Sequence, residues 1–272
     1  MCRLRVALFV EGSEYPYVRE HPLERLWNQT LASALGIPPF HRIYPISKKH
    51  LVSMNPDVPR PIGAGESFDQ ILVRKLNQDP FDAALVAWDL VPAWEPGGEF
   101  CRRNETIDLY RFLARSPVLP DSWRDKAHRR FTELEDGAAQ TGARVGPPIL
   151  EHGMILAVCM EPMFEALLVQ DERAVKRALE VTHTPRGWPT HGWGDPRERQ
   201  PDQRVLAPAI LSVRNMRPMP RYVKQIRGDM KTNKDGWDEY ILRKLVRDPR
   251  SRESIVNHPL SLRLRYLLIP TP

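Results

Sequence analysis

Three acidic residues each follow a run of apolar residues directly, in a position suited to metal or phosphate chemistry. They are Glu11, Asp89 and Glu161, and Glu165 stands four residues further on. Carboxylates that face one another repel unless a cation lies between them. Mg²⁺ prefers one or two carboxylates together with water and phosphate oxygens. The pattern therefore indicates a Mg²⁺ (or Mn²⁺) site built from Glu11, Asp89, Glu161 and Glu165.

Each of these acids also has a purely structural interpretation. Glu11 could cap the helix that follows it. If Pro162 opens a helix, Glu161 and Glu165 lie on one helical face near its N-terminus, where acids compensate the helix dipole.

The apolar runs predict buried strands of a parallel sheet, because central strands of such sheets are apolar on both faces. Ligands of open α/β sheets bind beyond the carboxyl ends of the strands, where these acids stand. Pro45 favours an edge position for its strand. The expected strands cover residues 6–10, 41–46, 81–89, 149–150 and 154–160.

Apolar residues at spacings of three and four predict helices between these strands and after them. Gly36 should end the first helix, and Asp171 should cap a later one. The expected helices cover residues 21–35, 67–76, 105–113, 121–139, 171–179, 204–214, 235–247, 251–257 and 258–268.

Together these elements predict an α/β fold, with a mostly parallel central sheet flanked by helices. Residues 1–181 should form the core, with a helical insertion at about 103–143, and residues 182–272 a loop followed by a basic helical region. In that loop, Trp188 and Trp193 could pack onto the core or stack on bases.

The composition excludes several classes of protein. No apolar run among the 272 residues approaches the ~20 that a membrane span needs. The apolar run near the start is too short for a secretory signal, which predicts a cytoplasmic protein without membrane contact. The three cysteines are widely separated, so the sequence predicts neither a disulfide framework nor a zinc site.

The net charge of +6 is unevenly distributed. Residues 204–272 hold 15 lysines and arginines against 6 acids, a net charge of +9, so the rest of the chain is at −3. A basic region beside an acidic metal site suits a protein that holds a polyanion, although solvated helix faces give the same composition. The expected nucleic-acid contacts are Lys48, Lys49, Arg214, Arg217, Arg221, Lys224 and Arg227.

Three segments together resemble the TOPRIM-like proteins of bacteria, in particular a branch often encoded in anti-phage islands. They are residues 8–14 near the start, the strand ending in Asp89, and residues 157–171. The resemblance covers most of the chain and implies a mostly parallel four-stranded α/β unit that binds Mg²⁺ for phosphodiester chemistry. Glu11 matches the family's strand-one glutamate and Asp89 the first residue of its Asp-x-Asp motif, whereas Val91 stands where the second aspartate is expected.

The resemblance implies two functions. One is a Mg²⁺-dependent nuclease, or nuclease-like subunit, of a prokaryotic defence system, acting on nucleic acid (DNA) beside a protein partner such as an ATPase. In it, Asp89 and Glu161 hold the metal, Glu11 helps to hold it or positions the attacking water, and Glu165 completes the site. The alternative is a catalytically lapsed TOPRIM-like scaffold that serves as a regulatory or partner-binding subunit, as Val91 suggests.

Overall fold

The computed structural model describes residues 4–12, 22–47, 50, 65–89, 105–141, 149–195, 197–226 and 234–269. Contacts divide the chain into two compact units that alternate along the sequence. The first unit contains Met1–Tyr17, Phe40–Trp88 and Arg102–Val158, and the second contains Val18–Pro39, Asp89–Cys101 and Cys159–Pro272. The expected domain boundary after residue 181 stays a prediction.

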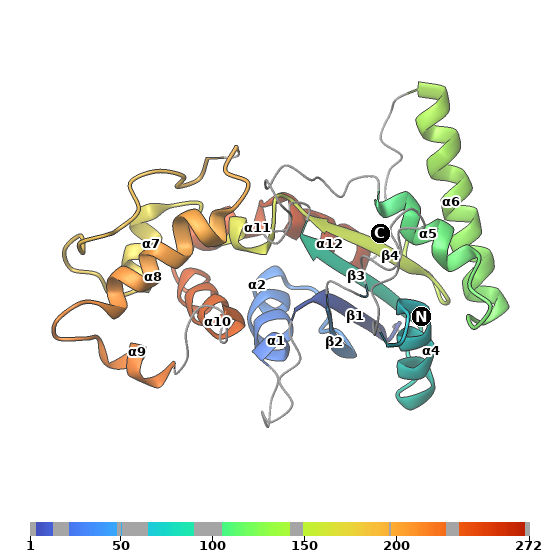
Figure 1. Ribbon diagram of the computed structural model, residues 1–272, viewed down its shortest axis with the longest axis horizontal. Coiled ribbons are helices and arrows are strands. Elements are labelled where there is room, and N and C mark those ends of the chain that lie inside the picture. The colour runs from blue at the N-terminus through green and yellow to red at the C-terminus, as the bar shows by residue number, and fades with distance from the viewer. Residues whose placement is uncertain are drawn as a thin grey trace. The chain divides into compact units, whose positions relative to one another are not determined.

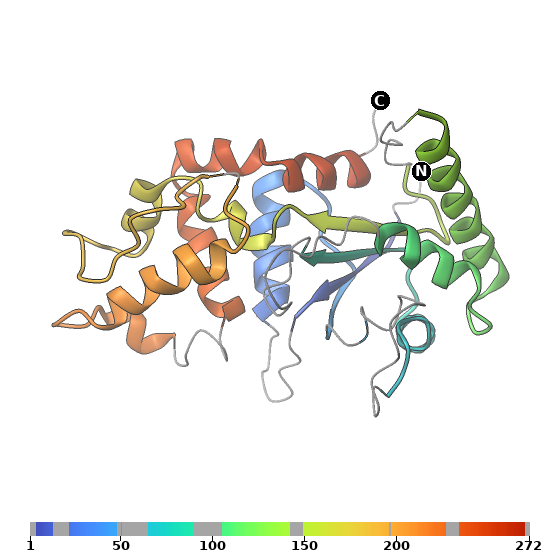
Figure 2. The ribbon, with the colours of Figure 1, turned by 45° about the horizontal axis from the view of Figure 1, so that its top comes forward.

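The first unit is built on a four-stranded sheet in the order β2-β1-β3-β4. All four strands are parallel, so the predicted α/β class is confirmed (Figures 1 and 2). The last residue of β3 and the last two of β4 group with the second unit. The strands are β1 Val6–Glu11, β2 Arg42–Ile46, β3 Ala83–Asp89 and β4 Ile155–Met160.

The register of the sheet explains why its central strands are continuously apolar. Leu8 of β1 lies opposite Ile43 of β2 and Leu85 of β3. Leu8 and Leu85 are fully buried because helices cover the sheet. β2 lies at an edge, as Pro45 predicted, and so tolerates a residue without a backbone N–H.

The strand expected at residues 149–150 is wrong. Ile149 is 77% exposed, and β4 begins only at Ile155. A turn separates the two, since the N–H of Met154 donates to the carbonyl of Glu151 and Gly153 adopts a left-handed φ of 76°. Glycine accepts that conformation without steric cost.

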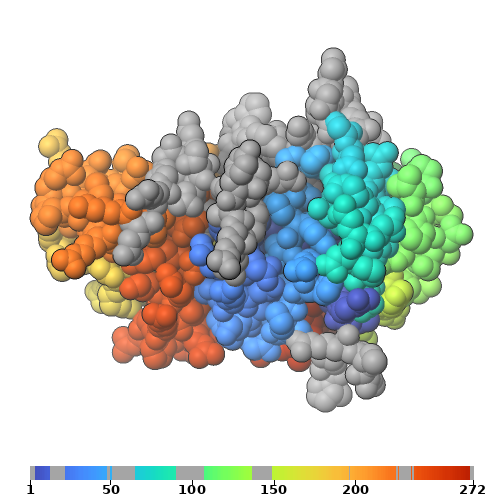
Figure 3. Space-filling view, turned by 90° about the horizontal axis from the view of Figure 1, so that it is seen from below, coloured from blue at the N-terminus to red at the C-terminus, as the bar shows by residue number. Residues whose placement is uncertain are grey.

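Among its described residues, the first unit has three longer helices, and the outer surface of α4 is seen in Figure 3. Two of them, α5 and α6, pack against each other and form the predicted helical insertion. The buried Tyr110 hydroxyl of α5 accepts the N–H of Ala157 in β4 at 2.9 Å. The helices are α4 Phe68–Gln78, α5 Glu105–Ala114 and α6 Asp121–Thr141.

In its described residues the second unit is mainly helical, apart from loops and the ends of β3 and β4. Its first helix, expected at residues 21–35, is present but is π-helical over η1, and ends at Gly36 with φ 64° as predicted. Asp171 caps α7 by accepting the N–H of Arg173 at 2.8 Å, also as predicted. The helices are α1 Pro22–Glu24, η1 Arg25–Ala32, α2 Ser33–Leu35, η2 Phe164–Leu167, α7 Glu172–Ala178, η3 Asp202–Leu206, α8 Ala207–Arg214, α9 Arg221–Gln225, α10 Lys234–Leu245, α11 Pro249–Val256 and α12 Pro259–Leu268.

Two tryptophans hold the loop between α7 and η3 in place. Trp188 is only 6% exposed and stacks on Trp193, with ring centroids 5.6 Å apart and planes within 14°. The indole N–H of Trp188 donates to the carboxylate of Glu172 at 3.0 Å. The interpretation of Trp188 as a packing residue is therefore confirmed. Within the described ranges, no helix combines the length and the apolar character needed to cross a membrane.

Candidate functional site

Glu11 and Asp89 are the last residues of two neighbouring strands, as the sequence predicted. β1 and β3 pair in parallel, with Val10 opposite Ala87, so both strands end at the same edge of the sheet. Both acids are half-buried. Glu11 belongs to the first unit and Asp89 to the second, and their joint use in one site stays a prediction.

Asp89 is oriented by the backbone within the second unit. Its Oδ1 accepts the N–H of Phe164 at 3.1 Å, at the start of η2. The Phe164 ring packs on Trp27 of η1, with centroids 5.3 Å apart. This packing fixes the donor and therefore the carboxylate that it binds. Nothing in the spacing of Asp89 and Phe164, 75 residues apart, indicated the contact.

The expected helix that would place Glu161 and Glu165 on one face is wrong. Met163 is extended, with φ −161° and ψ 174°, and the helix begins only at Phe164 as a short 3₁₀ turn. Glu161 is therefore outside the helix and exposed, whereas Glu165 is inside it and 1% exposed.

Glu165 has an ammonium partner inside the second unit. Lys234 Nζ forms an ion pair with Glu165 Oε1 and lies 3.5 Å from Asp202 Oδ2. Burial raises the pKa of Asp202, and the nearby charge of Glu198 adds to the increase. The Oε1 atom of Glu165 is therefore already occupied by a cationic group.

The Mg²⁺ site expected from the acidic residues stays a prediction. Within the described ranges, no three His, Cys, Asp or Glu side chains are grouped so that they could hold a metal ion. Mg²⁺ needs only one or two carboxylates when water and phosphate oxygens fill the remaining positions. Glu11 in the first unit and Asp89 in the second each carry the hard oxygen donors that this ion prefers.

The basic residues expected to bind nucleic acid are only partly described. Lys48, Lys49 and Arg227 lie outside the described residues. Arg214 ends α8 and is half-buried, whereas the other described members are exposed around or on α9. These exposed residues are Arg217, Arg221 and Lys224.

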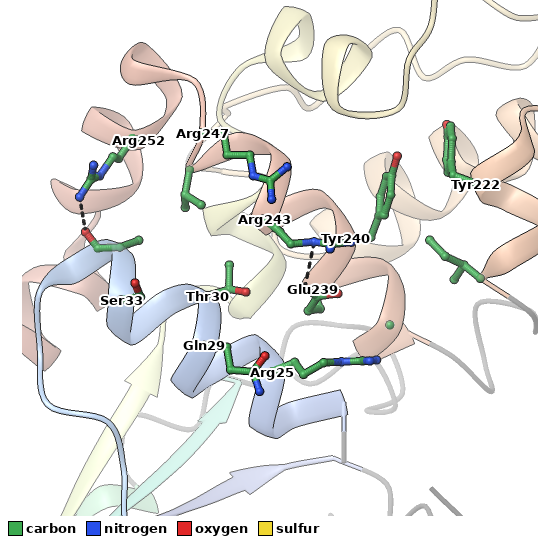
Figure 4. Close-up of a pocket in the computed structure, with 14 residues that line it drawn as sticks. Arg25, Gln29, Thr30, Ser33, Tyr222, Glu239, Tyr240, Arg243, Arg247 and Arg252 are labelled. Atoms are coloured by element: carbon green, nitrogen blue, oxygen red, sulfur yellow. Dashed lines mark hydrogen bonds and ion pairs between the residues drawn. The ribbon is translucent and has the colours of Figure 1, made fainter. Parts of the chain in front are cut away.

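The second unit also contains a basic cavity that the sequence did not predict. Its volume is about 870 Å³, and it is lined by helices η1, α2, α10 and α11 and by residues 222 and 226 (Figure 4). Its four arginines are far apart in the sequence, so the local charge pattern gave no signal of it. They are Arg25, Arg243, Arg247 and Arg252.

Comparisons with protein-family models, with curated proteins and with solved structures gave no match for this chain.

Proposed function

We propose that this protein is a Mg²⁺-dependent nuclease, or a nuclease-like subunit, that acts on the phosphodiester backbone of nucleic acid. The observation that carries the proposal is that Asp89, the last residue of β3, has its carboxylate held by the N–H of Phe164. Glu11 likewise is the last residue of its own strand, β1. The resemblance to TOPRIM-like proteins assigns chemistry to the same two residues.

The proposed roles follow from the chemistry of the carboxylates. Asp89, held by the N–H of Phe164, would bind Mg²⁺ together with Glu161 or Glu11. Glu11 would also position the attacking water by accepting its proton. When bound, the metal would polarise the scissile phosphate and lower the pKa of its water.

The setting of the protein is part of the same proposal. The resemblance suggests a prokaryotic defence system, a cytoplasmic location and a protein partner such as an ATPase. The net charge of +9 on residues 204–272 supports a polyanionic substrate, and DNA is the proposed one.

A catalytically lapsed scaffold is the second candidate function, and two observations favour it. Val91 stands where the family's motif has its second aspartate. Glu165, the acid expected to complete the site, is buried against Lys234. Such a chain would bind nucleic acid or a partner without cleaving the backbone.

Cleavage of supercoiled plasmid with Mg²⁺ or Mn²⁺ distinguishes the two candidates. Glu11→Gln and Asp89→Asn should each reduce nicking by at least about 100-fold, since loss of even an outer-shell metal partner costs about 10–100-fold. Asn at position 89 retains the acceptor for the Phe164 N–H, so the loss would report on charge. Asp125→Asn, at an exposed acid of α6, is the matched control and should leave nicking unchanged.

Two results would overturn the nuclease proposal. One is equal nicking by the parent chain and both variants, which would indicate a contaminating enzyme. The other is the absence of nicking in the parent chain under every metal condition, which would leave the scaffold as the surviving candidate.

A further inference from the structure

The cavity of the second unit is an open groove between two helical walls. One wall is η1 with α2, and the other is α10, as the sticks in Figure 4 show. Arg252 of α11 lies at one end of the groove and Tyr222 of α9 toward the other. Its volume of about 870 Å³ lies within the ~300–1,000 Å³ typical of ligand sites.

The lining of the groove carries a strong positive charge. Four arginines face a single acid, Glu239, which pairs with Arg243 at 3.2 Å. Neither Arg25 nor Arg247 has an ion-pair partner among the residues that the structure describes. Arg252 donates to the carbonyl of Ala34 at 3.4 Å, a neutral acceptor that leaves its charge uncompensated. The groove therefore holds excess positive charge that an anionic ligand would neutralise.

The positions of the arginines suit a chain of phosphates. Arg243 lies in the last turn of α10 and Arg247 in the turn that follows it, so the two arginines lie close together at one end of the same wall. Arg25 comes from the facing wall, so charge is available on both sides of a strand. Guanidinium groups bind phosphate oxygens bidentately, which favours arginine over lysine for this contact.

The aromatic residues of the groove do not provide a platform for bases. Tyr222 and Tyr240 are 8% and 6% exposed and stack on each other, with centroids 4.8 Å apart. Their hydroxyls are also used, by the carbonyl of Leu179 and by the carboxylate of Glu180. Recognition here would consequently involve the backbone of the ligand more than its bases.

We propose that this arginine groove binds the sugar-phosphate backbone of a single-stranded nucleic acid. The four arginines that line the groove are exposed, so an extended strand could reach all of them from solvent. Its η1 wall is π-helical, a conformation frequent at functional sites. The inference rests on the proposed function, because it names the form of nucleic acid that the second unit holds, but it requires no cleavage.

Fluorescence anisotropy with a labelled 12-nucleotide DNA strand tests the groove without catalysis, in EDTA and over a series of salt concentrations. Arg25→Gln and Arg247→Gln should each weaken binding about fivefold at 0.1 M salt. Each should also lower the slope of log K against log salt by about 0.7, the value for one phosphate contact of a single strand. Arg250→Gln is the matched control, because Arg250 is exposed on α11 but does not line the groove.

Three results would overturn the proposal. The first is unchanged binding and slope in both groove variants while their thermal melting matches that of the parent chain. The second is an equal loss in Arg250→Gln, which would show diffuse attraction to surface charge. The third is competition by free tripolyphosphate as effective, mole for mole, as an unlabelled strand, which would indicate a compact phosphate site.

Failure of the groove proposal can be distinguished from failure of the nuclease proposal. Asp89→Asn should bind the strand normally in EDTA even where it abolishes nicking. If the parent chain binds the strand but never nicks plasmid, the groove proposal is supported and only the nuclease proposal is contradicted.

Discussion

Each unit buries an acid, and the two acids are stabilised in different ways. Asp69, in the first unit, is 5% exposed and accepts hydrogen bonds from the Ser67 hydroxyl, the Gln70 N–H at 2.9 Å and the Ser116 hydroxyl at 2.6 Å. Glu165, in the second unit, is 1% exposed and depends on the ammonium of Lys234. Its Oε2 is buried without a hydrogen-bond partner among the described residues.

The comparison separates a structural acid from one that could change state. Three neutral groups donate hydrogen bonds to the Asp69 carboxylate, so this carboxylate is held in place. Glu165 and Asp202 share one ammonium, which leaves an excess of buried negative charge. Excess charge of this kind is costly in the protein interior and sensitive to pH and to cations.

Replacing Lys234 gives the largest expected effect. Lys234→Met should lower the free energy of unfolding by about 3–5 kcal/mol at pH 7.5, the cost of removing one partner from a buried ion pair. The loss should be smaller at pH 5, because the pKa of Asp202 is already raised by burial and an acid that protonates on folding is stabilised as pH falls. Urea unfolding at the two pH values measures both.

The matched control is Lys244→Met on the same helix. Lys244 pairs with Glu180 while both side chains remain partly exposed, so its loss should cost less than about 1 kcal/mol. Equal effects of the two substitutions would remove the contrast between the buried acids.

Asp69→Ala should have the second largest effect. It deletes three hydrogen bonds to a charged acceptor and leaves the Ser116 hydroxyl buried, a loss of about 3 kcal/mol. Asp69→Asn keeps an acceptor for Ser67 and Gln70 and should cost about 1 kcal/mol. Both are measured by urea unfolding at pH 7.5. Identical values for Ala and Asn would show that the network contributes little, and the two buried acids would then be alike.

His258 offers a test of pH dependence in the second unit. Burial lowers the pKa of His258 to about 4, and its Nδ1 accepts the N–H of Leu260 at 3.3 Å as the N-cap of α12. The unfolded histidine binds its proton near pH 6.5 and the folded one near pH 4. The contribution of the neutral His258 to the free energy of unfolding is therefore fully present above pH 6.5. It decreases as pH falls toward 4, by roughly 3 kcal/mol in total, because about 2.5 pKa units separate the two states at about 1.4 kcal/mol each.

His258→Asn keeps a good capping residue without the titration. The difference in unfolding free energy between the parent chain and this variant should therefore change with pH between 6.5 and 4. A constant difference over that interval would show that His258 is not held neutral.

The fold was largely predictable from the sequence, because its signals are local. Continuous apolar runs located β1, β3 and β4, and Pro45 placed β2 at an edge. Gly36 and Asp171 located helix ends through backbone conformations and caps that depend on neighbouring residues alone. The strand-end positions of Glu11 and Asp89 followed from the same apolar pattern.

The surroundings of the candidate sites were not predictable in the same way. Lys234 is 69 residues from Glu165, and Arg25 is 218 residues from Arg243. Contacts of this kind depend on how helices pack, which a residue pattern does not specify. The helix expected after Pro162 failed for a local reason, because Met163 adopts an extended backbone that periodicity cannot reveal.

Each margin of the sheet has one backbone position that cannot pair with a further strand. At one margin, Pro45 of β2 offers no N–H to an incoming chain. At the other, the Tyr110 hydroxyl already occupies the N–H of Ala157 in β4. A copy that joined edge to edge would lose one ladder hydrogen bond at either margin, which disfavours the cross-strand aggregation that open sheets invite.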